Sequence, residues 1–371
     1  MIFLEKLKKI DRGIVVLMLC LVAVGTVAVY RATTGTKLDG LHISGMMYFG
    51  VFCIPMLLVT VFNYRLLTGK LAYYLYAFGI GMLAYVHWKG QVVNGAARWL
   101  SIGSVEIQPS EPVKLFTILL AAHLLHKRQG EKLRFVQDLL PVGVVFAIPI
   151  VFILKQPDLG TALVFVGIFF GMLWMGNIRL SYMLTAVGAA GVAIGTVLWL
   201  YYVDHELLAK MIKPHQMSRI QTFLEPASDP QKSWHYEQAL MAIGSGQLNG
   251  NALDQQQGSI PYAYSDSIFA VVGEKYGFLG AAILLMLYLL LVYRMVGIIL
   301  ETKELAGSYL ITGTTAMLVF QIYVNIGMHI GLVPLTGISL PFISYGGSSL
   351  LTNMVALGLV LNVKIHQGSF E

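Results

Sequence analysis

Charged residues are scarce in this sequence. Only 12% of its 371 residues are Asp, Glu, Lys or Arg, whereas 57% are hydrophobic. Soluble domains carry about 25% charged residues, so this composition excludes an ordinary soluble protein and indicates a membrane protein. The net charge of +6 is modest for the length. In a membrane protein it favours contact with anionic membrane lipid, and it gives no reason to expect a nucleic-acid partner.

Cysteine and nucleotide-binding motifs are almost absent. The two cysteines, Cys20 and Cys53, both lie in apolar runs, which excludes a disulfide framework and a cysteine-based metal site. The sequence has no Walker A motif, so no ATP site is indicated. His123 and His126 are three residues apart, but two basic residues follow His126. That pattern is typical of a helix end at the membrane surface, not of a metal site.

Long uncharged runs are abundant and predict transmembrane helices, each of which needs about 20 mainly apolar residues. Such runs occupy 13–30, 45–62, 71–86, 139–154, 159–178, 180–203, 276–293, 305–328 and 342–363. A further span must extend upstream from His126 through Pro112, because residues 115–125 are too few to cross alone. We therefore expect an all-α, polytopic protein with about ten spans, in one transmembrane domain over 1–371.

The distribution of Lys and Arg predicts the orientation. With the N-terminus inside, the inner segments hold 14 of these residues and the short outer segments hold six. The basic stretch from Lys6 to Arg12 precedes a run too long for a signal peptide, so the first span is expected to remain uncleaved. The long 204–265 connection then lies outside, and its apolar stretch 234–243 could lie flat on the membrane.

Polar clusters open four of the predicted spans. A charged side chain at membrane depth costs about 2.5–3.5 kcal/mol by insertion scales, so each is a functional candidate. The clusters are 108–114 with Glu111 and Lys114, 156–161 with Asp158, 264–274 with Asp266 and Glu274, and 344–349 with Ser344, Gly346, Gly347 and Ser348.

Each cluster also has a simpler explanation. Glu111 and Lys114 could pair only to neutralise one another, Asp158 and Asp266 could only cap helices, and the paired glycines could only allow close helix packing. All four clusters nevertheless fall at outward-facing helix N-termini, the positive ends of helix dipoles. With Arg98 and Lys155 nearby in sequence, these ends suit an anionic group such as a pyrophosphate.

Five segments together resemble the SEDS family (shape, elongation, division and sporulation), which includes RodA and FtsW. They are ARWLSIG at 97–103, QPSEPVK at 108–114, KQPDLGTA at 155–162, SDSIFAVVGEKYGFLG at 265–280 and LPFISYGGSSLL at 340–351. The resemblance implies a multi-pass glycosyltransferase of the bacterial cytoplasmic membrane, with both termini cytoplasmic. It implies lipid II as the substrate, peptidoglycan strands as the product and a class B penicillin-binding protein as the partner.

The resemblance also implies roles for particular residues. The family's essential acid falls on Asp266, and the sequence departs from relatives immediately around it. Relatives commonly have His-Thr before this acid, where this chain has Tyr264 and Ser265. Many have Glu-Glu at the position of Glu274 and Lys275. The segment 233–236, Ser-Trp-His-Tyr, replaces a glycine-containing stretch.

We therefore expect Asp266 to act as a general base on the acceptor hydroxyl. Arg98, Lys114 and the Gly346–Gly347 backbone would stabilise the departing pyrophosphate. Further contacts to the substrate are expected from Lys155, Glu111, Asp158, Glu274, Ser344 and Ser348. A divalent cation, Mg²⁺ or Mn²⁺, could assist, although the sequence contains no ligand pattern that establishes a metal site.

Two other functions remain open at this stage. A lipid II flippase would also have many spans and intramembrane charges, but transporters tend to place their site near the membrane midplane. A scaffold that binds a partner through its helices would leave the charged clusters unexplained. Among enzymes, the short termini favour a RodA-like role in elongation and cell shape over an FtsW-like role in division.

Overall fold

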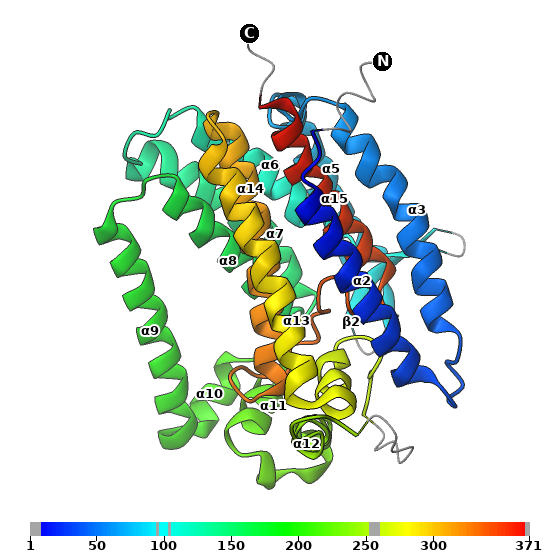
Figure 1. Cartoon of the computed structure of the whole chain (residues 1–371). Helices are drawn as coiled ribbons and strands as arrows, with labels where there is room; N and C mark the ends of the chain where they lie inside the picture. Colours follow the sequence, from blue (N-terminus) through cyan, green and yellow to red (C-terminus); the bar gives the residue numbers. More distant parts are fainter. Residues whose placement is uncertain (1–8, 94–95, 103–104, 252–259, 368–371) are drawn as a thin grey trace.

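The computed structural model describes residues 9–93, 96–102, 105–251 and 260–367. Parts of the N-terminal basic stretch and of the 204–265 connection lie outside these described residues. The long helices run side by side along the molecule (Figure 1). They are α2 (Arg12–Thr33), α3 (Leu41–Val61), α5 (Leu71–Lys89), α6 (Ser110–His126), α7 (Leu140–Lys155), α8 (Leu159–Met175), α9 (Leu180–Val203), α13 (Ile268–Glu301), α14 (Leu305–His329) and α15 (Gly347–His366).

The all-α, polytopic membrane fold is confirmed. Among the described residues, seven helices are long and apolar enough to cross a membrane: α2, α3, α7 together with the π-helical turn η1 (Phe135–Leu139), α9, α13, α14 and α15. The shorter or more polar α5, α6 and α8 pack within the same bundle. A count of about ten spans therefore stays a prediction.

The bundle has a centre and an edge. In the most apolar windows of α14 and α15, 67% and 72% of residues are buried, against 6% in α9. Helix α9 accordingly stands at the side of the molecule in Figure 1. The polar residues of the candidate active site are carried mainly by the central helices and by the segments that lead into them.

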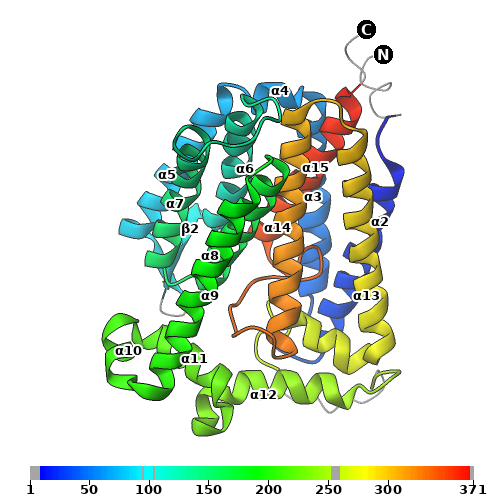
Figure 2. The same cartoon turned by 90° about the vertical axis from the view of Figure 1, so that its left-hand side faces the viewer.

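The two ends of the molecule differ. Helix α2 begins and α15 ends at one end, which we call the termini end (Figure 1). The opposite loop end carries α10 (His205–Met211), α11 (Pro214–Leu224), the 3-10 turn η2 (Pro226–Ser228) and α12 (Pro230–Ser245). Helix α12, which contains the apolar stretch 234–243, lies across the bundle (Figure 2), the orientation expected of an interfacial helix.

Two features of the loop end are not predicted by the pattern of apolar residues. Between α5 and α6 the chain forms an antiparallel sheet of β1 (Gln91–Val93), β2 (Ala96–Ile102) and β3 (Val105–Ile107), in the order β1-β2-β3. Helix α13 is broken at Gly277, whose φ of 60° and ψ of −159° are not helical. A residue with a side chain would be strained at this φ, which accounts for glycine here.

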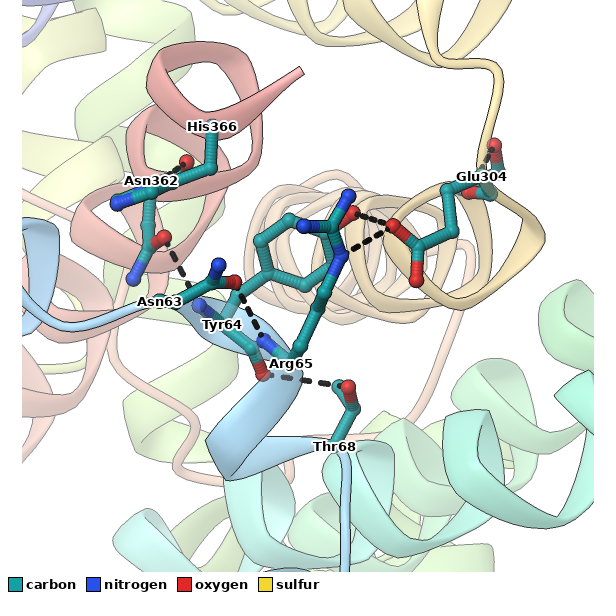
Figure 3. A network of polar contacts seen from close by, with 8 residues as sticks. Asn63, Tyr64, Arg65, Thr68, Glu304, Asn362 and His366 are labelled. Atoms are coloured by element: carbon teal, nitrogen blue, oxygen red, sulfur yellow. Dashed lines mark hydrogen bonds and ion pairs between the residues drawn. The ribbon is translucent and has the colours of Figure 1, made fainter. Parts of the chain in front are cut away.

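The termini end is held together by a polar network (Figure 3). Tyr64, in the short helix α4 (Tyr64–Leu67), donates from Oη to Glu304 Oε2 at 2.7 Å, and Arg65 Nε donates to the same oxygen at 2.6 Å. Asn362 Oδ1 accepts from the Tyr64 amide at 3.1 Å. Since Glu304 precedes α14 and Asn362 lies in α15, this network joins α4 to two largely buried helices.

Candidate active site

A cavity of about 410 Å³ opens where the N-terminal ends of α6, α8 and α15 meet the segment that leads into α13. All four polar clusters contribute to its lining, so the helix ends expected to carry the site do converge. Its charged and polar lining includes Arg98, Gln108, Glu111, Lys114, Asp158, Arg219, Asp266, Gly346 and Ser348.

Asp266 stands just before α13, and its backbone is fixed from two sides. Asn325 Nδ2, in the central helix α14, donates to the Asp266 carbonyl oxygen at 2.7 Å. From the loop before α15, Ser344 Oγ donates to Ser265 O at 2.7 Å, and the Tyr345 amide donates to the carbonyl of Tyr264 at 2.9 Å. The carboxylate is therefore presented by a turn bound to two other elements.

The environment of Asp266 makes its carboxylate more basic than usual. Burial raises the pKa of the Asp266 carboxyl to about 6, while hydrogen bonds from its own amide and from that of Ser267 oppose the rise. A carboxylate with a pKa near 6 is mostly ionised at neutral pH, yet it accepts a proton more readily than an ordinary aspartate. This combination suits a general base.

Glu111 and Lys114 form the ion pair expected from their spacing on α6. Lys114 Nζ lies 2.9 Å from Glu111 Oε1, and both residues are buried. The other carboxylate oxygen, Glu111 Oε2, is buried and has no hydrogen-bond partner within the part of the chain that the structure describes. A buried carboxylate oxygen without a hydrogen-bond partner is uncommon in native proteins.

Arg98 reaches from strand β2 to the turn that starts α8. Its Nε donates to Gln156 O at 3.0 Å, its guanidinium also donates to Pro157 O, and Nη1 lies 3.7 Å from Asp158 Oδ2. Asp158 Oδ1 in turn caps α8 by accepting from the Thr161 amide at 3.1 Å. The role of Asp158 as a helix cap is thus confirmed. Arg98 positions this turn and also adds positive charge to the cavity.

Arg219, on α11, is a lining residue that the sequence analysis did not single out. Burial, and next the repulsion of Arg98, lower the pKa of its guanidinium, while the attraction of Asp158 opposes this. It forms no ion pair with the described residues, unlike Lys114 and Arg98. Its charge in the cavity is therefore the least compensated. A charged residue in a long connection between spans carries no sequence signal, because charge is inexpensive outside the membrane.

Gly346 and Ser348 bring the start of α15 to the cavity. Ser348 Oγ accepts from the Gln108 amide at 3.0 Å, which ties this helix end to the approach to α6. Gln108 Nε2 in turn donates to Asp158 Oδ2 at 3.4 Å. The ends of α6, α8 and α15 are thus linked by one chain of hydrogen bonds around the cavity.

Four predicted substrate-binding residues lie outside this lining: Lys155, Glu274, Ser344 and Gly347. Lys155 is exposed at the end of α7. Glu274 pairs with Lys275 at 2.9 Å, before the break at Gly277. Ser344 holds the Asp266 turn through Ser265. The geometry therefore does not favour contact between these four residues and the reacting groups.

The sequence assigns no residues to hold the divalent cation that could assist the reaction. In the described ranges, no group of three or more His, Cys, Asp or Glu residues is placed to hold a metal ion. Two of the acids that line the cavity form ion pairs instead, Glu111 with Lys114 and Asp158 with Arg98.

Comparisons with known proteins identify the family. The cell cycle protein family of FtsW, RodA and SpoVE matches residues 11–369. Stage V sporulation protein E of Bacillus subtilis strain 168 is 32% identical over 95% of this chain and 96% of its own length. The peptidoglycan glycosyltransferase RodA of Treponema pallidum is 29% identical over 96% of this chain and 98% of its own.

Solved structures show the same fold. A chain of a peptidoglycan synthase complex that coordinates polymerization and crosslinking superposes with a TM-score of 0.81 at 29% identity, covering 97% of this chain and 98% of that one. The rod shape determining protein RodA of Thermus thermophilus superposes with a TM-score of 0.71 at 28% identity and the same coverage. This chain therefore belongs to the FtsW, RodA and SpoVE family of cell cycle proteins, the SEDS family whose five motifs its sequence carries.

Proposed function

We propose that this protein is a peptidoglycan glycosyltransferase that polymerises lipid II at the outer face of the cytoplasmic membrane. One observation carries the proposal: the Asp266 carboxylate, with a pKa raised to about 6, lines the same cavity as Arg98, Lys114 and Arg219. Transfer from a pyrophosphate-linked sugar needs a base that removes the acceptor proton and positive charge that stabilises the leaving pyrophosphate. A base beside a group of cations provides both. Relatives named peptidoglycan glycosyltransferases support the same reaction.

The transfer is a single displacement. The 4-hydroxyl oxygen of the acceptor sugar forms a bond to the anomeric carbon of the donor, and the bond from that carbon to the pyrophosphate oxygen breaks. The hydroxyl proton passes to the Asp266 carboxylate, and undecaprenyl pyrophosphate leaves with the bonding electron pair. Because the donor sugar is α-linked, one inversion gives a β-linked strand without a second carboxylate as nucleophile.

Charge that develops on the leaving pyrophosphate needs donors already in place. Arg219, whose charge is not taken up by an ion pair among the described residues, is the first candidate. Arg98 and Lys114 add positive charge from positions fixed by their own partners. The amides at the start of α15, near Gly346, add the positive end of a helix dipole.

The orientation and partner follow from the same proposal. The loop end faces the outside and both termini face the cytoplasm, as the Lys and Arg distribution predicts. The similar chain in a peptidoglycan synthase complex supports a class B penicillin-binding protein as the transpeptidase partner. Relatives named stage V sporulation protein E, FtsW and RodA all match at about 30% identity, so a role in elongation stays a prediction.

A flippase is the alternative to exclude. Its site would have to open toward both faces of the membrane, whereas this cavity is lined from the loop end. The network of Tyr64, Arg65 and Glu304 binds the termini end together, and none of its residues lines the cavity. These observations favour chemistry at one face over passage through the molecule.

The proposal is tested with the full-length protein in detergent, with and without its cognate transpeptidase. Labelled lipid II is added and glycan strands are resolved on a gel. We expect polymer from the wild type in the presence of the transpeptidase. Absence of polymer under both conditions, together with movement of labelled lipid II across protein-containing vesicles, would establish the flippase instead.

A further inference from the structure

A second hollow of about 260 Å³ adjoins the cavity beneath α11 and α12. We call it the aromatic chamber, after its wall of Phe223, His235, Tyr236 and Tyr262. It shares five lining residues with the cavity: Arg219, Tyr262, Asp266, Thr336 and Gly337. Asp266 thus faces two compartments, and a group bound in either one can approach its carboxylate.

The two compartments differ in charge. The cavity is lined by Arg98 and Lys114 as well as the shared Arg219, and by several acids. The aromatic chamber has no charged lining residue apart from the shared Arg219 and Asp266, within the described part of the chain. The other side chains of its lining are aromatic, aliphatic or hydroxyl-bearing. Ser218, Thr222 and Ser267 are among the hydroxyl-bearing ones.

The aromatic wall is built from side chains that support one another. The His235 ring is stacked on Tyr262, with centroids 6.1 Å apart and an angle of 21° between the planes. Tyr236 is held close to the backbone of Gly331, where a Cβ atom would lie 2.6 Å from the Tyr236 hydroxyl. Burial lowers the pKa of the His235 imidazole, so at neutral pH the ring is mostly uncharged.

We propose that the aromatic chamber binds the acceptor sugar and that the His235–Tyr262 pair determines which acceptor is accepted. The inference rests on the proposed glycosyltransferase function and adds a subsite to it. The donor carries a pyrophosphate and requires the cations of the cavity. The acceptor contributes only an uncharged hydroxyl to the reaction. Flat rings pack on the apolar faces of a sugar ring, while their polar edges and nearby hydroxyls meet its hydroxyl groups.

The position of Asp266 supports this division. A general base must lie within hydrogen-bond reach of the proton that it removes. A sugar in the aromatic chamber can present its hydroxyl to Asp266 from one side, while the donor approaches from the cavity on the other side.

The test uses two probes, one that can act only as donor and one that can act only as acceptor. Lipid II without its 4-hydroxyl can act only as donor, and a disaccharide-pentapeptide methyl glycoside without pyrophosphate can act only as acceptor. Their coupling gives one countable product, so KM can be measured separately for each probe with the full-length protein and its transpeptidase. The variants are His235→Ala, Tyr262→Ala and Tyr262→Phe. Met241→Ala, exposed on the same helix α12 and outside both linings, is the control.

We expect His235→Ala and Tyr262→Ala to raise KM for the acceptor probe by about tenfold and to leave KM for the donor probe within about twofold. Tyr262→Phe keeps the ring and loses only the hydroxyl, so it should raise the acceptor KM less than Tyr262→Ala does. Thermal unfolding of each variant, measured beside Met241→Ala, shows that a rise in KM is not a loss of fold. An unchanged acceptor KM, or a rise confined to the donor KM, would overturn the subsite. A wild type that couples neither probe would instead overturn the proposed function and the subsite with it.

Discussion

Asn325 Nδ2 donates to the backbone oxygen of Asp266 at 2.7 Å and to that of Ile338 at 2.6 Å. One buried amide on α14 therefore joins the turn that presents the base to the loop that precedes α15. Because α14 is largely buried within the bundle, this contact fixes the position of Asp266 relative to the packed interior of the molecule. Asn325 is a positioning residue, since it acts on Asp266 and not on the substrate.

Replacement of Asn325 should impair catalysis through Asp266. Asn325→Leu leaves two buried carbonyl groups without a donor, at about 1–3 kcal/mol of unfolding free energy for each. Loss of position at the reacting group should lower kcat by about tenfold to a hundredfold with little change in KM. Thermal unfolding and initial polymerisation rates measure the two effects.

The control for this variant lies one turn earlier on α14. Gln321 is fully buried, and neither of its side-chain polar atoms has a hydrogen-bond partner among the described residues. Gln321→Leu should leave kcat near wild type and should not reduce stability. A shifted pH profile in Asn325→Leu, absent from Gln321→Leu, would distinguish positioning of Asp266 from general damage. Equal kcat in the two variants contradicts the positioning role.

The rate should depend on pH through Asp266. Its pKa is raised to about 6, and the base acts only when ionised, so the rate should fall as the pH drops through about 6. An ordinary aspartate would keep the rate constant down to a pH of about 4. Initial rates from about pH 4.5 to about pH 8, with protein stability checked at each value, separate these outcomes. A constant rate down to about pH 4.5 would show that Asp266 is not the titrating base.

The Glu111–Lys114 pair should behave as one unit. Removal of one partner, as in Glu111→Gln or Lys114→Met, strands a buried charge at a cost of about 3–5 kcal/mol. The double variant should recover most of that stability, because no charge is left unpaired. Polymerisation should remain impaired in the double variant, since the cavity has lost a cation. Additive stability losses in thermal unfolding would show that the two side chains are not coupled.

Arg219 should contribute mainly to binding of the pyrophosphate. Arg219→Gln removes charge-assisted hydrogen bonds worth about 1.5–3 kcal/mol, which corresponds to a loss of about tenfold to a hundredfold in kcat/KM. Lys210→Gln, an exposed change of the same kind on α10, is the matched control and should have no such effect. If both variants lose activity equally, the charge of the outer connection matters in general and Arg219 has no specific role.

The positions that could be predicted from sequence are those where the residue type is energetically unfavourable in its expected environment. Glu111, Lys114 and Asp158 stand out because charge at membrane depth needs a reason, and each is found in the cavity lining. The convergence of the helix ends was suggested by their common direction in the membrane. Asp266 was assigned through its motif.

The remainder depends on contacts between distant segments. Arg219 lies in a connection where charge is unremarkable, and only the docking of α11 over the bundle makes it part of the site. Asn325 looks like any polar residue of a transmembrane helix until its two carbonyl partners are known. Conversely, Glu274 looked like a site residue, but the neighbouring Lys275 pairs with it outside the cavity.

The most direct test of the account is the polymerisation rate of Asp266→Asn, which keeps the size of the side chain and removes the base. The variant should retain wild-type thermal stability and binding of the donor-only lipid II. It should lose about 10²–10⁴-fold of the rate, the usual contribution of a general base. Polymer formed by folded Asp266→Asn at the wild-type rate would contradict the assignment of Asp266 as the base and, with it, the mechanism proposed for this protein.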